Sequence, residues 1–577
     1  MTAYYLGLST SGHDPALAIV DEEGRLVFAE ATERFLQDKR GWGAAPDHVH
    51  HLSAVLRALN LDLPSARFVV ATSWSQIKAD LDVSVSEVLL PAAESHWIRG
   101  LQARAQRDAG ASLLQMGLGG QMEADIRRYD HHLCHAVAAC HSAPFSEGLC
   151  LVMDGEGEVG AASLYRLKEG WPRRLWRSWG PGSLGTYYAW LTGLCGFDWK
   201  AGEEWKVMGL AAFGTPDSEL VRALGDVMTI EAGRIRLSGE AMIAAAKDAA
   251  ARHARQPSQP VMLAADLAAS GQLAYARMAD QVVAACLDAQ PGNLILTGGC
   301  ALNSAYNGTV LRRFPVRALH VPCAPGDDGN AVGAALLAWH QDHPDAALPR
   351  GDGSPFLGTR PAGAKIAAAV ANAGPLHVHG TTGFTAEAIA ERLAAGRIIG
   401  VMRGAAEFGP RALGHRSILA DPRPKDMADR LNIRVKGREP YRPFAPVVPL
   451  DRMGDWFEHA QPSPYMSFTL PWKASARPRV PAVVHQDGTG RLQTVDASSD
   501  PWMSDLLQAF ERKSGVPIVL NTSFNVMGKP IVHTVEDAMA VLMTTGLDGV
   551  LLGDALVEKA PFIVPGDGAG TDAHPSP

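Results

Sequence analysis

The sequence has 577 residues, of which 47% are hydrophobic and 20% are charged, and its formal net charge is −8. One hydrophobic core rarely supports this length, so we expect at least two domains. The acidic balance argues against general nucleic-acid binding, which normally shows basic runs or a basic excess. The chain shows neither a signal peptide nor 18 uninterrupted apolar residues, so we expect a cytoplasmic protein without a membrane span.

The seven cysteines form no Cys-x-x-Cys pair. A zinc knuckle would need such close pairs, and a disulfide framework belongs to small secreted domains. We therefore predict reduced and mostly buried thiols.

Two similar strand units lie about 140 residues apart in the first half of the chain. Residues 4–10 predict a buried strand, and residues 16–34 predict two strands joined by an Asp-Glu-Glu-Gly turn. Residues 149–167 repeat this plan, with an apolar strand that ends in Asp-Gly-x-Gly and then another strand. The repetition predicts an internally duplicated α/β domain with a cleft between its halves, the pattern of actin-like ATPase folds.

Three histidines lie in the stretch "YDHHLCHAVAAC", residues 129–140. His131 and His135 are four positions apart, which on an α-helix places both imidazoles on one face, about 5–6 Å apart at Cβ. The pattern is compatible with half of a metal site. Taken alone, it favours a polar start to a buried helix.

Two glycine-containing turns precede predicted helices later in the first domain. Residues 293–308 read as strand, Gly-Gly turn and helix start, and residues 323–341 as a loop that enters an apolar helix. Either turn could present backbone amides to a phosphate at a helix N-terminus, or serve only as a tight turn.

A stretch rich in Pro, Gly and Ala, residues 342–380, predicts the boundary between domains. A helix and a strand are predicted in residues 385–404, and Thr534 with Asp537 predicts a capping box before another helix. The predicted organisation is a first domain at 1–350, a linker region at 351–380, a second domain at 381–562 and a disordered tail at 563–577.

Positive charge gathers in the second domain, although the whole chain is acidic. Cations that fall within forty residues around short polar motifs include Arg403, Arg411, Arg416, Lys436, Arg438 and Arg442. Interleaved Gly, Pro and Phe argue against a long solvated basic helix, and arginine's planar fork suits phosphate and carboxylate. We therefore predict a shaped anion pocket; the alternative is arginines scattered over the surface. Further polar residues able to hold an amide or a nucleotide are Arg491, Asn521, Ser523 and Asn525.

Ten motifs along the chain resemble one family. In order they are "DHHLCHA", "MDGEGE", "GSLGTYYAWLT", "EEWKVMGLAAFG", "GGCALN", "APGDDGNAVGAAL", "EFGPRALGHRSILADPR", "REPYRPFAP", "QTV" and "NTSFNVMGKPIV". With these motifs, residues 4–555 resemble the NodU/CmcH family of O-carbamoyltransferases, which modify antibiotics and nodulation factors.

The resemblance implies an α/β fold in two parts. Residues 1–350 would form a duplicated actin-like, Kae1-like domain, and residues 381–562 a YrdC-like domain with a twisted sheet. The C-terminal domain would convert carbamoyl phosphate and ATP, with Mg²⁺, to carbamoyladenylate through a carbamate. The N-terminal domain would transfer the carbamoyl group to a hydroxyl of a natural product. Adenylation supplies a leaving group to a poor electrophile, and enclosure limits its hydrolysis.

The resemblance also implies a metal site in the N-terminal domain. Its matched ligand positions are His131, His135, Asp154 and Asp327. This mixed nitrogen and oxygen set suits Fe²⁺, Zn²⁺ or Mn²⁺, and the family favours Fe²⁺. Asp328 is an alternative to Asp327, and His132 is expected to lie behind the two histidine ligands.

The remaining site residues implied by the resemblance bind substrates. The adenylate contacts expected in the N-terminal domain are Lys206, Gly298, Gly299 and Asn303. The contacts expected for carbamoyl phosphate and ATP in the C-terminal domain are Arg411, Lys436, Arg442, Arg491, Asn521 and Ser523. His13 and Asp14 are candidates for activating the acceptor hydroxyl; the alternative is a structural Asp-Pro turn.

Three other classes use related modules. A tRNA threonylcarbamoyladenosine enzyme would need a basic surface, and a hydrogenase-maturation enzyme would need Cys-x-x-Cys zinc motifs. A non-catalytic actin-like ATP-binding regulator would leave the arginine cluster without a purpose. We therefore expect a small-molecule acceptor, no nucleic acid and no membrane, with a homodimer as the oligomeric state suggested by the family.

Overall fold

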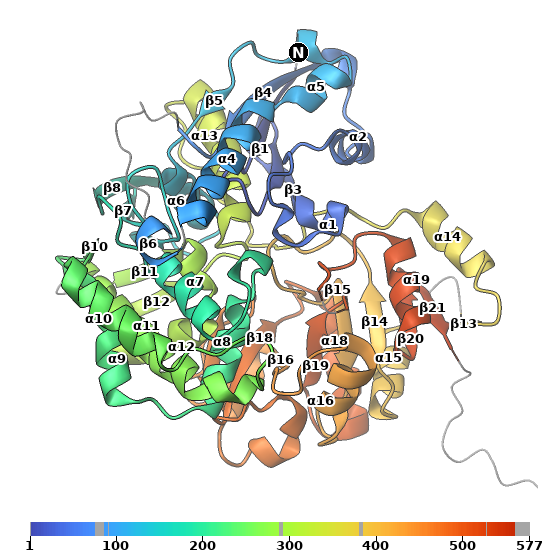
Figure 1. The fold of residues 1–577 in the computed structure, drawn as a ribbon. Coiled ribbons are helices and arrows are strands. Elements are labelled where there is room, and N and C mark those ends of the chain that lie inside the picture. Colours follow the sequence, from blue (N-terminus) through green and yellow to red (C-terminus); the bar gives the residue numbers. More distant parts are fainter. Residues whose placement is uncertain are drawn as a thin grey trace, which may run out of the picture.

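Two five-stranded sheets of one topology form the N-terminal half of the protein (Figure 1). This computed structural model describes residues 2–75, 86–90, 92–287, 292–379, 385–526 and 528–559. The first sheet has the order β3 (Leu26–Ala31), β2 (Ala16–Val20), β1 (Thr2–Leu8), β4 (Ala66–Thr72) and β5 (Arg127–Arg128). The second has the order β8 (Trp171–Arg177), β7 (Ala162–Lys168), β6 (Gly148–Met153), β11 (Gly292–Thr297) and β12 (Val316–His320). Their common order agrees with the duplication predicted from the sequence.

Helices α6 (His131–His141) and α13 (Asn330–Asp342) form a buried layer between the two sheets. Side chains alternate along β1, so Tyr5 faces this layer while Leu6 faces the opposite side of the sheet. Because both faces of β1 are covered, the strand reads as a nearly continuous apolar run.

Gly333 of α13 lies where the two buried helices cross. A Cβ atom at this position would lie 2.0 Å from the carbonyl oxygen of Cys134 in α6. The backbones are therefore in direct contact, and this contact fixes the position of the helix that carries His131 and His135.

Gly333→Ala is expected to destabilise the protein by about 3 kcal/mol, because two packed backbones must separate. Gly225→Ala is the matched control, since Gly225 also lies in a helix and an added Cβ would meet nothing within 4 Å. The control should gain about 0.5 kcal/mol from helix propensity. Denaturant unfolding measures both changes, and equal stability of the two variants would contradict the close contact.

Further helices cover the outer faces of both sheets. On the first sheet, α2 (Val49–Ala58) and α5 (Ala111–Gln115) pack against residues such as Leu6 and Phe28. The helices on the side of the second sheet are α7 (Leu184–Leu194), α8 (Glu204–Leu210), α9 (Ser218–Gly225), α10 (Glu240–Ala251) and α11 (Ala265–Cys286).

A mixed nine-stranded sheet organises the C-terminal part. Its order is β13 (His377–His379), β21 (Ala555–Glu558), β20 (Gly549–Leu552), β14 (Ile399–Met402), β15 (Arg416–Ala420), β19 (Val519–Ser523), β16 (Ala445–Pro449), β18 (Thr489–Val495) and β17 (Phe468–Pro471). One face packs on α15 (Ala386–Ala394) and α18 (Pro501–Ser514), and the other on α19 (Val535–Thr544). The predicted capping box of Thr534 and Asp537 is confirmed at the start of α19.

The stretch predicted as a linker is partly regular. It holds α14 (Gly363–Ala371), which packs on α19, and β13, which pairs with β21. Its end is therefore built into the C-terminal sheet. The predicted disordered tail, 563–577, lies outside the described residues.

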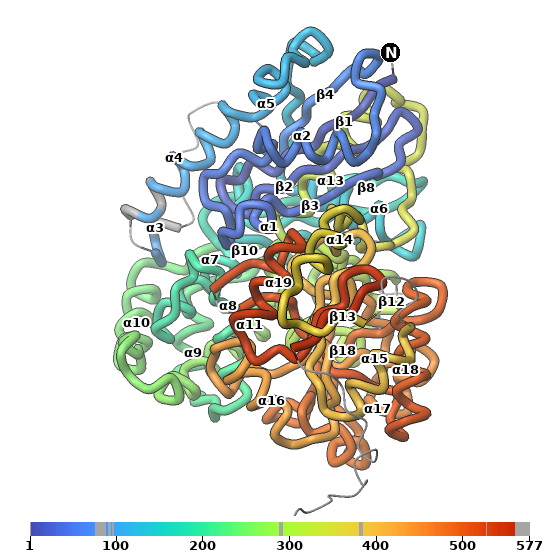
Figure 2. Tube along the Cα trace, turned by 90° about the vertical axis from the view of Figure 1, so that its right-hand side faces the viewer, coloured from blue at the N-terminus to red at the C-terminus, as the bar shows by residue number. Residues whose placement is uncertain are grey.

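The two parts meet directly, as the tube view in Figure 2 also shows. Edge strand β17 lies on α12 (Ser304–Arg313), where a Cβ on Gly308 would lie 2.0 Å from the carbonyl oxygen of Thr469. The Asn307 amide also donates to the Ser467 carbonyl at 3.2 Å. Contacts of this closeness predict that the parts pack as one body.

All seven cysteines are free thiols, and six of them are buried. Burial raises the pKa of Cys195 and of Cys286 to about 12. Thiols of this kind are poor nucleophiles at neutral pH. The prediction of reduced and mostly buried cysteines is confirmed.

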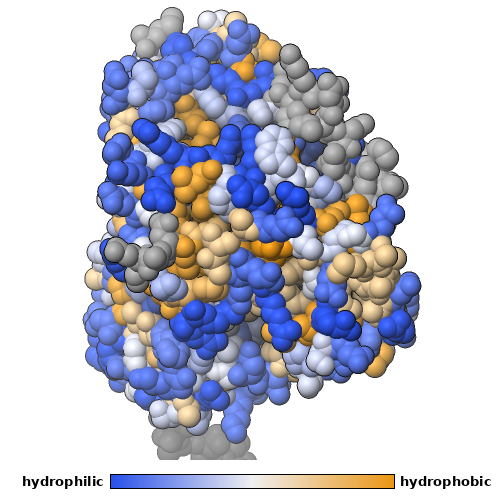
Figure 3. Space-filling view, turned by 90° about the vertical axis from the view of Figure 1, so that its left-hand side faces the viewer, coloured by the Kyte–Doolittle hydropathy of each residue, from blue (hydrophilic) through white to orange (hydrophobic). Residues whose placement is uncertain are grey.

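The face in Figure 3 is mostly hydrophilic, with apolar residues in patches across its middle. Large apolar side chains that are exposed among the described residues include Trp97 and Ile433. None of the described helices combines the length and the apolar character needed to cross a bilayer.

Candidate active sites

Acidic side chains fix the start of α6. Asp130 accepts a hydrogen bond from the Leu133 amide at 3.0 Å, and Glu158 accepts one from the His131 amide, also at 3.0 Å. Carboxylates at this end satisfy free amides and complement the helix dipole. The helix therefore begins at His131, and the imidazoles of His131 and His135 meet with ring centroids 4.8 Å apart.

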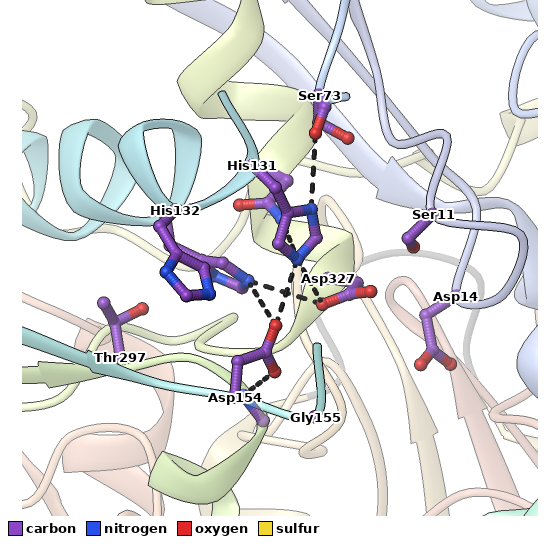
Figure 4. A network of polar contacts seen from close by, with 12 residues as sticks. Ser11, Asp14, Ser73, His131, His132, Asp154, Gly155, Thr297 and Asp327 are labelled. Carbon is purple, nitrogen blue, oxygen red and sulfur yellow. Dashed lines mark hydrogen bonds and ion pairs between the residues drawn. The ribbon is translucent and has the colours of Figure 1, made fainter. Parts of the chain in front are cut away.

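Two buried carboxylates meet these histidines and complete a group of four side chains (Figure 4). Nε2 of His131 lies 3.0 Å from Oδ2 of Asp154 and 3.5 Å from Oδ1 of Asp327. Nε2 of His135 lies 3.4 Å from both of these oxygens. Asp154 follows β6 of the second sheet and Asp327 precedes α13, which packs on β1 of the first sheet, so the group lies between the two sheets.

The hydrogen bonds of this group fit a bound cation. Nδ1 of His131 lies 3.3 Å from the Ser73 carbonyl and 3.2 Å from the Asn330 amide nitrogen; with the proton on Nδ1, the lone pair of Nε2 faces Asp154. Nε2 of His135 is buried and has no hydrogen-bond partner. In that tautomer, Nε2 of His131 and Oδ2 of Asp154 are two acceptors 3.0 Å apart, so a proton or a metal ion must lie between them. Without metal, a proton occupies the position between these two atoms. Burial lowers the pKa of His131, but the carboxylates of Asp327 and Asp154 outweigh burial and hold this pKa above its ordinary value.

The structure separates the alternatives that the sequence left open. Asp327 faces both histidines, whereas Asp328 accepts the Gly329 amide at 3.0 Å and lies outside the four-residue group. Burial, followed by the charge of Asp14, raises the pKa of Asp328 to about 7. His132 points away to Ser163 at 2.8 Å, and burial with the adjacent histidine lowers its pKa to about 3.

His13 and Asp14 adjoin the same group. Nε2 of His13 lies 3.6 Å from Oδ2 of Asp327, and its Nδ1 lies 2.9 Å from Asp14. Arg40 donates to Asp14 at 3.0 Å, and together with His13 it holds the pKa of Asp14 below its ordinary value against the effect of burial. The Trp42 ring lies edge-on to His13, with centroids 4.9 Å apart. Their proposed role as acceptor-activating residues remains a prediction.

The residues predicted to hold adenylate in the N-terminal part are engaged within the protein. The Gly299 amide donates to Oδ1 of Asp154 at 2.8 Å, and Asn303 caps α12 by accepting from the Tyr306 amide at 3.1 Å. Gly298 has a φ of 86°, and a Cβ there would lie 2.3 Å from a backbone oxygen of Met153. The two glycines therefore bring the loop up to Asp154.

Lys206 lies at the contact between the two parts. Its ammonium pairs with Glu203 at 2.6 Å and with Glu439 of the C-terminal part at 3.1 Å. Its charge is compensated by these carboxylates in the structure, and its role toward a nucleotide phosphate remains a prediction.

Five cations of the C-terminal part influence one another. Burial lowers the pKa of Arg411 and of Arg442 to about 10, and burial with Arg442 lowers that of Arg438 to about 9. The pKa values of Arg491 and Lys436 fall well below their ordinary range, first through burial and then through neighbouring cations. Such a cluster is electrostatically unfavourable until an anion enters it.

Buried polar atoms of this cluster and of neighbouring Asn521 lack a hydrogen-bond partner. The Nε atoms of Arg442 and Arg491 are buried without a partner, as is Oδ1 of Asn521. Lys436 donates to Oδ1 of Asn525 at 2.7 Å and to the Ser523 carbonyl. Buried donors without partners are costly, so these atoms fit a polar ligand such as phosphate.

Two of the predicted pocket arginines are used elsewhere. Arg416 is fully buried and donates to backbone carbonyls, among them that of Arg403 at 2.8 Å. Arg403 pairs with Asp500. These two side chains hold the loop that carries Arg411.

The sequence did not indicate several residues of the two sites. The Trp205 ring of α8 lies 3.4 Å under the guanidinium of Arg442, so the N-terminal part forms a wall of the cation cluster. Asn330 contacts the His131 ring at 3.2 Å, and Glu158 holds the start of its helix. The one feature of the sequence that could have indicated Glu158 is the acidic "GEGE" run directly after Asp154.

Two family models match the chain. "Carbamoyltransferase N-terminus" matches residues 4–336, and "Carbamoyltransferase C-terminus" matches residues 390–559. Nodulation protein NolNO of Sinorhizobium fredii is 36% identical over 96% of this chain and 80% of its own length. An uncharacterized protein of Synechocystis sp. is 31% identical over 96% and 97%, and nodulation protein U of Sinorhizobium fredii is 30% identical over 90% and 93%.

A buried histidine–aspartate group and a separate cation cluster in one chain are typical of an enzyme with two ligand sites. The two family models identify the class of enzyme, because together they match both parts of the molecule. The chain belongs to the carbamoyltransferase family and is a carbamoyltransferase. This confirms the resemblance of the ten motifs and decides against a non-catalytic regulator.

Proposed function

We propose that the protein is an ATP-dependent O-carbamoyltransferase that modifies a hydroxyl of a small natural product, in particular an antibiotic. The single observation that carries this proposal is the separation of two sites of different chemistry. One is a cation cluster with unpartnered donors, and the other is a buried group of metal-ligating side chains. A reaction in two steps, with a reactive intermediate between them, requires such a pair.

The cation cluster suits the first step. Water would hydrolyse carbamoyl phosphate to carbamate and inorganic phosphate, and a carbamate oxygen would then attack the α-phosphorus of ATP to give carbamoyladenylate and pyrophosphate. Arg411, Arg442 and Arg491 would neutralise the charge that grows on each leaving group, without reorganisation at that moment. The unpartnered Oδ1 of Asn521 is an acceptor of the kind that the amide of the carbamoyl group needs.

The buried histidine–aspartate group suits the second step, in which the acceptor oxygen bonds to the carbamoyl carbon and AMP leaves. His131, His135, Asp154 and Asp327 would hold Fe²⁺, Zn²⁺ or Mn²⁺, and such an ion would polarise the carbamoyl donor. His13 would take the hydroxyl proton, because Asp14 and Arg40 orient its ring and its Nε2 faces the group.

We assign the two parts to fold families in the same proposal. The shared topology of the two five-stranded sheets, with two helices between them, supports an actin-like, Kae1-like core for the N-terminal part. The twisted mixed sheet of the C-terminal part is compatible with a YrdC-like domain.

The decisive experiment omits the acceptor. Purified protein is mixed with carbamoyl phosphate, ATP and Mg²⁺, and pyrophosphate is measured while carbamoyladenylate is sought by mass spectrometry. Both products are expected, and ATP without carbamoyl phosphate should give neither. If a folded, metal-supplied protein released no pyrophosphate, the proposal would fail.

Nucleotide binding is expected to take up a proton at Lys436. Burial and neighbouring cations lower the pKa of this lysine in the free protein, whereas an anionic phosphate favours its charged form and raises the pKa. Between these two pKa values the complex binds more protons than the free protein, so affinity falls as pH rises. Calorimetry of ATP binding at about pH 9, in two buffers of different ionisation enthalpy, measures the uptake. Lys436→Met should take up fewer protons than the unmodified protein, and equal heats in both buffers with the unmodified protein would contradict the assignment.

A further inference from the structure

A second group of metal-ligating side chains lies where the first sheet meets the C-terminal part. Glu30 lies in β3, His51 lies in α2, and His533 precedes α19. The tube view in Figure 2 shows β3 and the short helix α1 (Thr32–Leu36) beside α19. None of the three residues belongs to either site proposed for the transfer reaction.

The three ligand atoms converge on one point. Nε2 of His51 lies 2.9 Å from Oε2 of Glu30, and Nε2 of His533 lies 3.1 Å from the same oxygen. Zinc bonds of about 2.0–2.2 Å to nitrogen and oxygen place neighbouring tetrahedral ligands about 3.3–3.5 Å apart. Shifts of a few tenths of an ångström would therefore suffice to admit the ion.

Burial makes compensation of the charge on Glu30 necessary. Glu30 is 0% exposed and His51 is 1% exposed. Within the described part of the chain, the ion pairs of Glu30 involve these two histidines and neither lysine nor arginine. A buried carboxylate without compensation is costly, and a divalent cation bound by neutral imidazoles provides that compensation.

The surroundings hold the three side chains in place. Thr359 donates to Glu30 twice, from its amide at 3.0 Å and from its hydroxyl at 2.8 Å. Phe35 stacks on His51 with centroids 4.9 Å apart and meets His533 edge-on at 5.7 Å. Hydrogen bonds that orient a ligating carboxylate, within an apolar shell, are typical around bound metals.

We propose that Glu30, His51 and His533 bind a divalent transition metal, best matched by Zn²⁺, that fastens the C-terminal part to the N-terminal sheet. Two imidazoles and one carboxylate are a ligand set that zinc uses, with a fourth position left for water. Burial keeps this ion away from substrates, so its role is structural. Ligands from both parts make binding of the ion favour their association.

The test counts metal in the full chain. The protein and its variants are equilibrated with Zn²⁺, freed of unbound ion and measured by inductively coupled plasma mass spectrometry. His533→Gln is expected to lower the count by one per chain, and the unmodified protein should melt at a higher temperature with Zn²⁺ than the variant does. His50→Gln is the matched control, because His50 is exposed on the same helix as His51.

Two further variants keep the result interpretable. If His533→Gln fails to fold, Glu30→Gln removes the charge with an isosteric side chain and should lose the same ion. His131→Ala, tested alongside, removes a ligand of the other group, so that loss at the two sites is counted separately. Equal zinc content in the unmodified protein, Glu30→Gln and His533→Gln would overturn the proposal and leave a carboxylate–imidazole ion pair.

Discussion

His131→Ala is expected to lose carbamoyl transfer by about 100-fold or more, while the protein still forms carbamoyladenylate at close to the unmodified rate. Loss of an outer-sphere partner already costs about 10–100-fold in metal affinity or activity, and His131 would be a direct ligand. The cation cluster keeps all of its side chains in this variant. Product formation with an acceptor, and pyrophosphate release without one, measure the two steps separately.

His132→Gln is the matched control for this experiment. His132 is the next residue of the same helix, but its ring bonds to Ser163 and lies outside the four-residue group. The control should keep its metal and its transfer activity, provided that it folds. If His131→Ala lost pyrophosphate release as completely as transfer, the division of the reaction between the two sites would be wrong.

Arg491→Met is expected to lose pyrophosphate release by about 100-fold or more, the usual effect of removing a preorganised donor from a developing charge. The stability of the ligand-free variant, in contrast to its activity, should not fall. The pKa of Arg491 is lowered by burial and then by three other arginines, so its charge destabilises the free folded protein. We therefore expect an unchanged or higher melting temperature without ligand, and a smaller rise on adding ATP.

Arg452→Met serves as the control, because Arg452 is a surface residue of the C-terminal part that pairs with Asp455. Exposed pairs contribute about 0–1 kcal/mol, so activity and stability should change little. A clear loss of stability in Arg491→Met would mean that this arginine has a structural role and that the cluster is not held open for an anion.

Much of the fold could be predicted from local patterns in the sequence. Strands buried on both faces are continuous apolar runs, and Thr534 with Asp537 marks the start of α19 through contacts three residues apart. The four-residue spacing of His131 and His135 likewise predicted both rings on one helical face, because residues this close in sequence are neighbours on a helix. Asp154 and Asp327 were predicted from their match to the family's motifs. In the structure Asp327 lies next to His131, whereas Asp328 accepts a hydrogen bond from the Gly329 amide.

Contacts between distant segments could not be predicted in this way. Trp205 stacks on Arg442, and Glu30 meets His533, through pairings that only the assembled sheets create. Lys206 illustrates the same limit, since its motif resembled a nucleotide contact while Glu439 compensates its charge in the fold. A composition rich in Pro, Gly and Ala likewise did not reveal α14, because helix formation there depends on packing against α19.

The ring of Trp205 under Arg442 has a consequence for the construction of chimeric enzymes. An exchange of C-terminal parts between relatives, made at the chain connection near residue 350, would join Arg442 of one parent to α8 of the other. In such a hybrid, the cation cluster would pack against an α8 helix from the other parent, even though every residue of the exchanged part was retained. Productive hybrids should therefore transplant α8 together with the loop that carries Glu439 and Arg442.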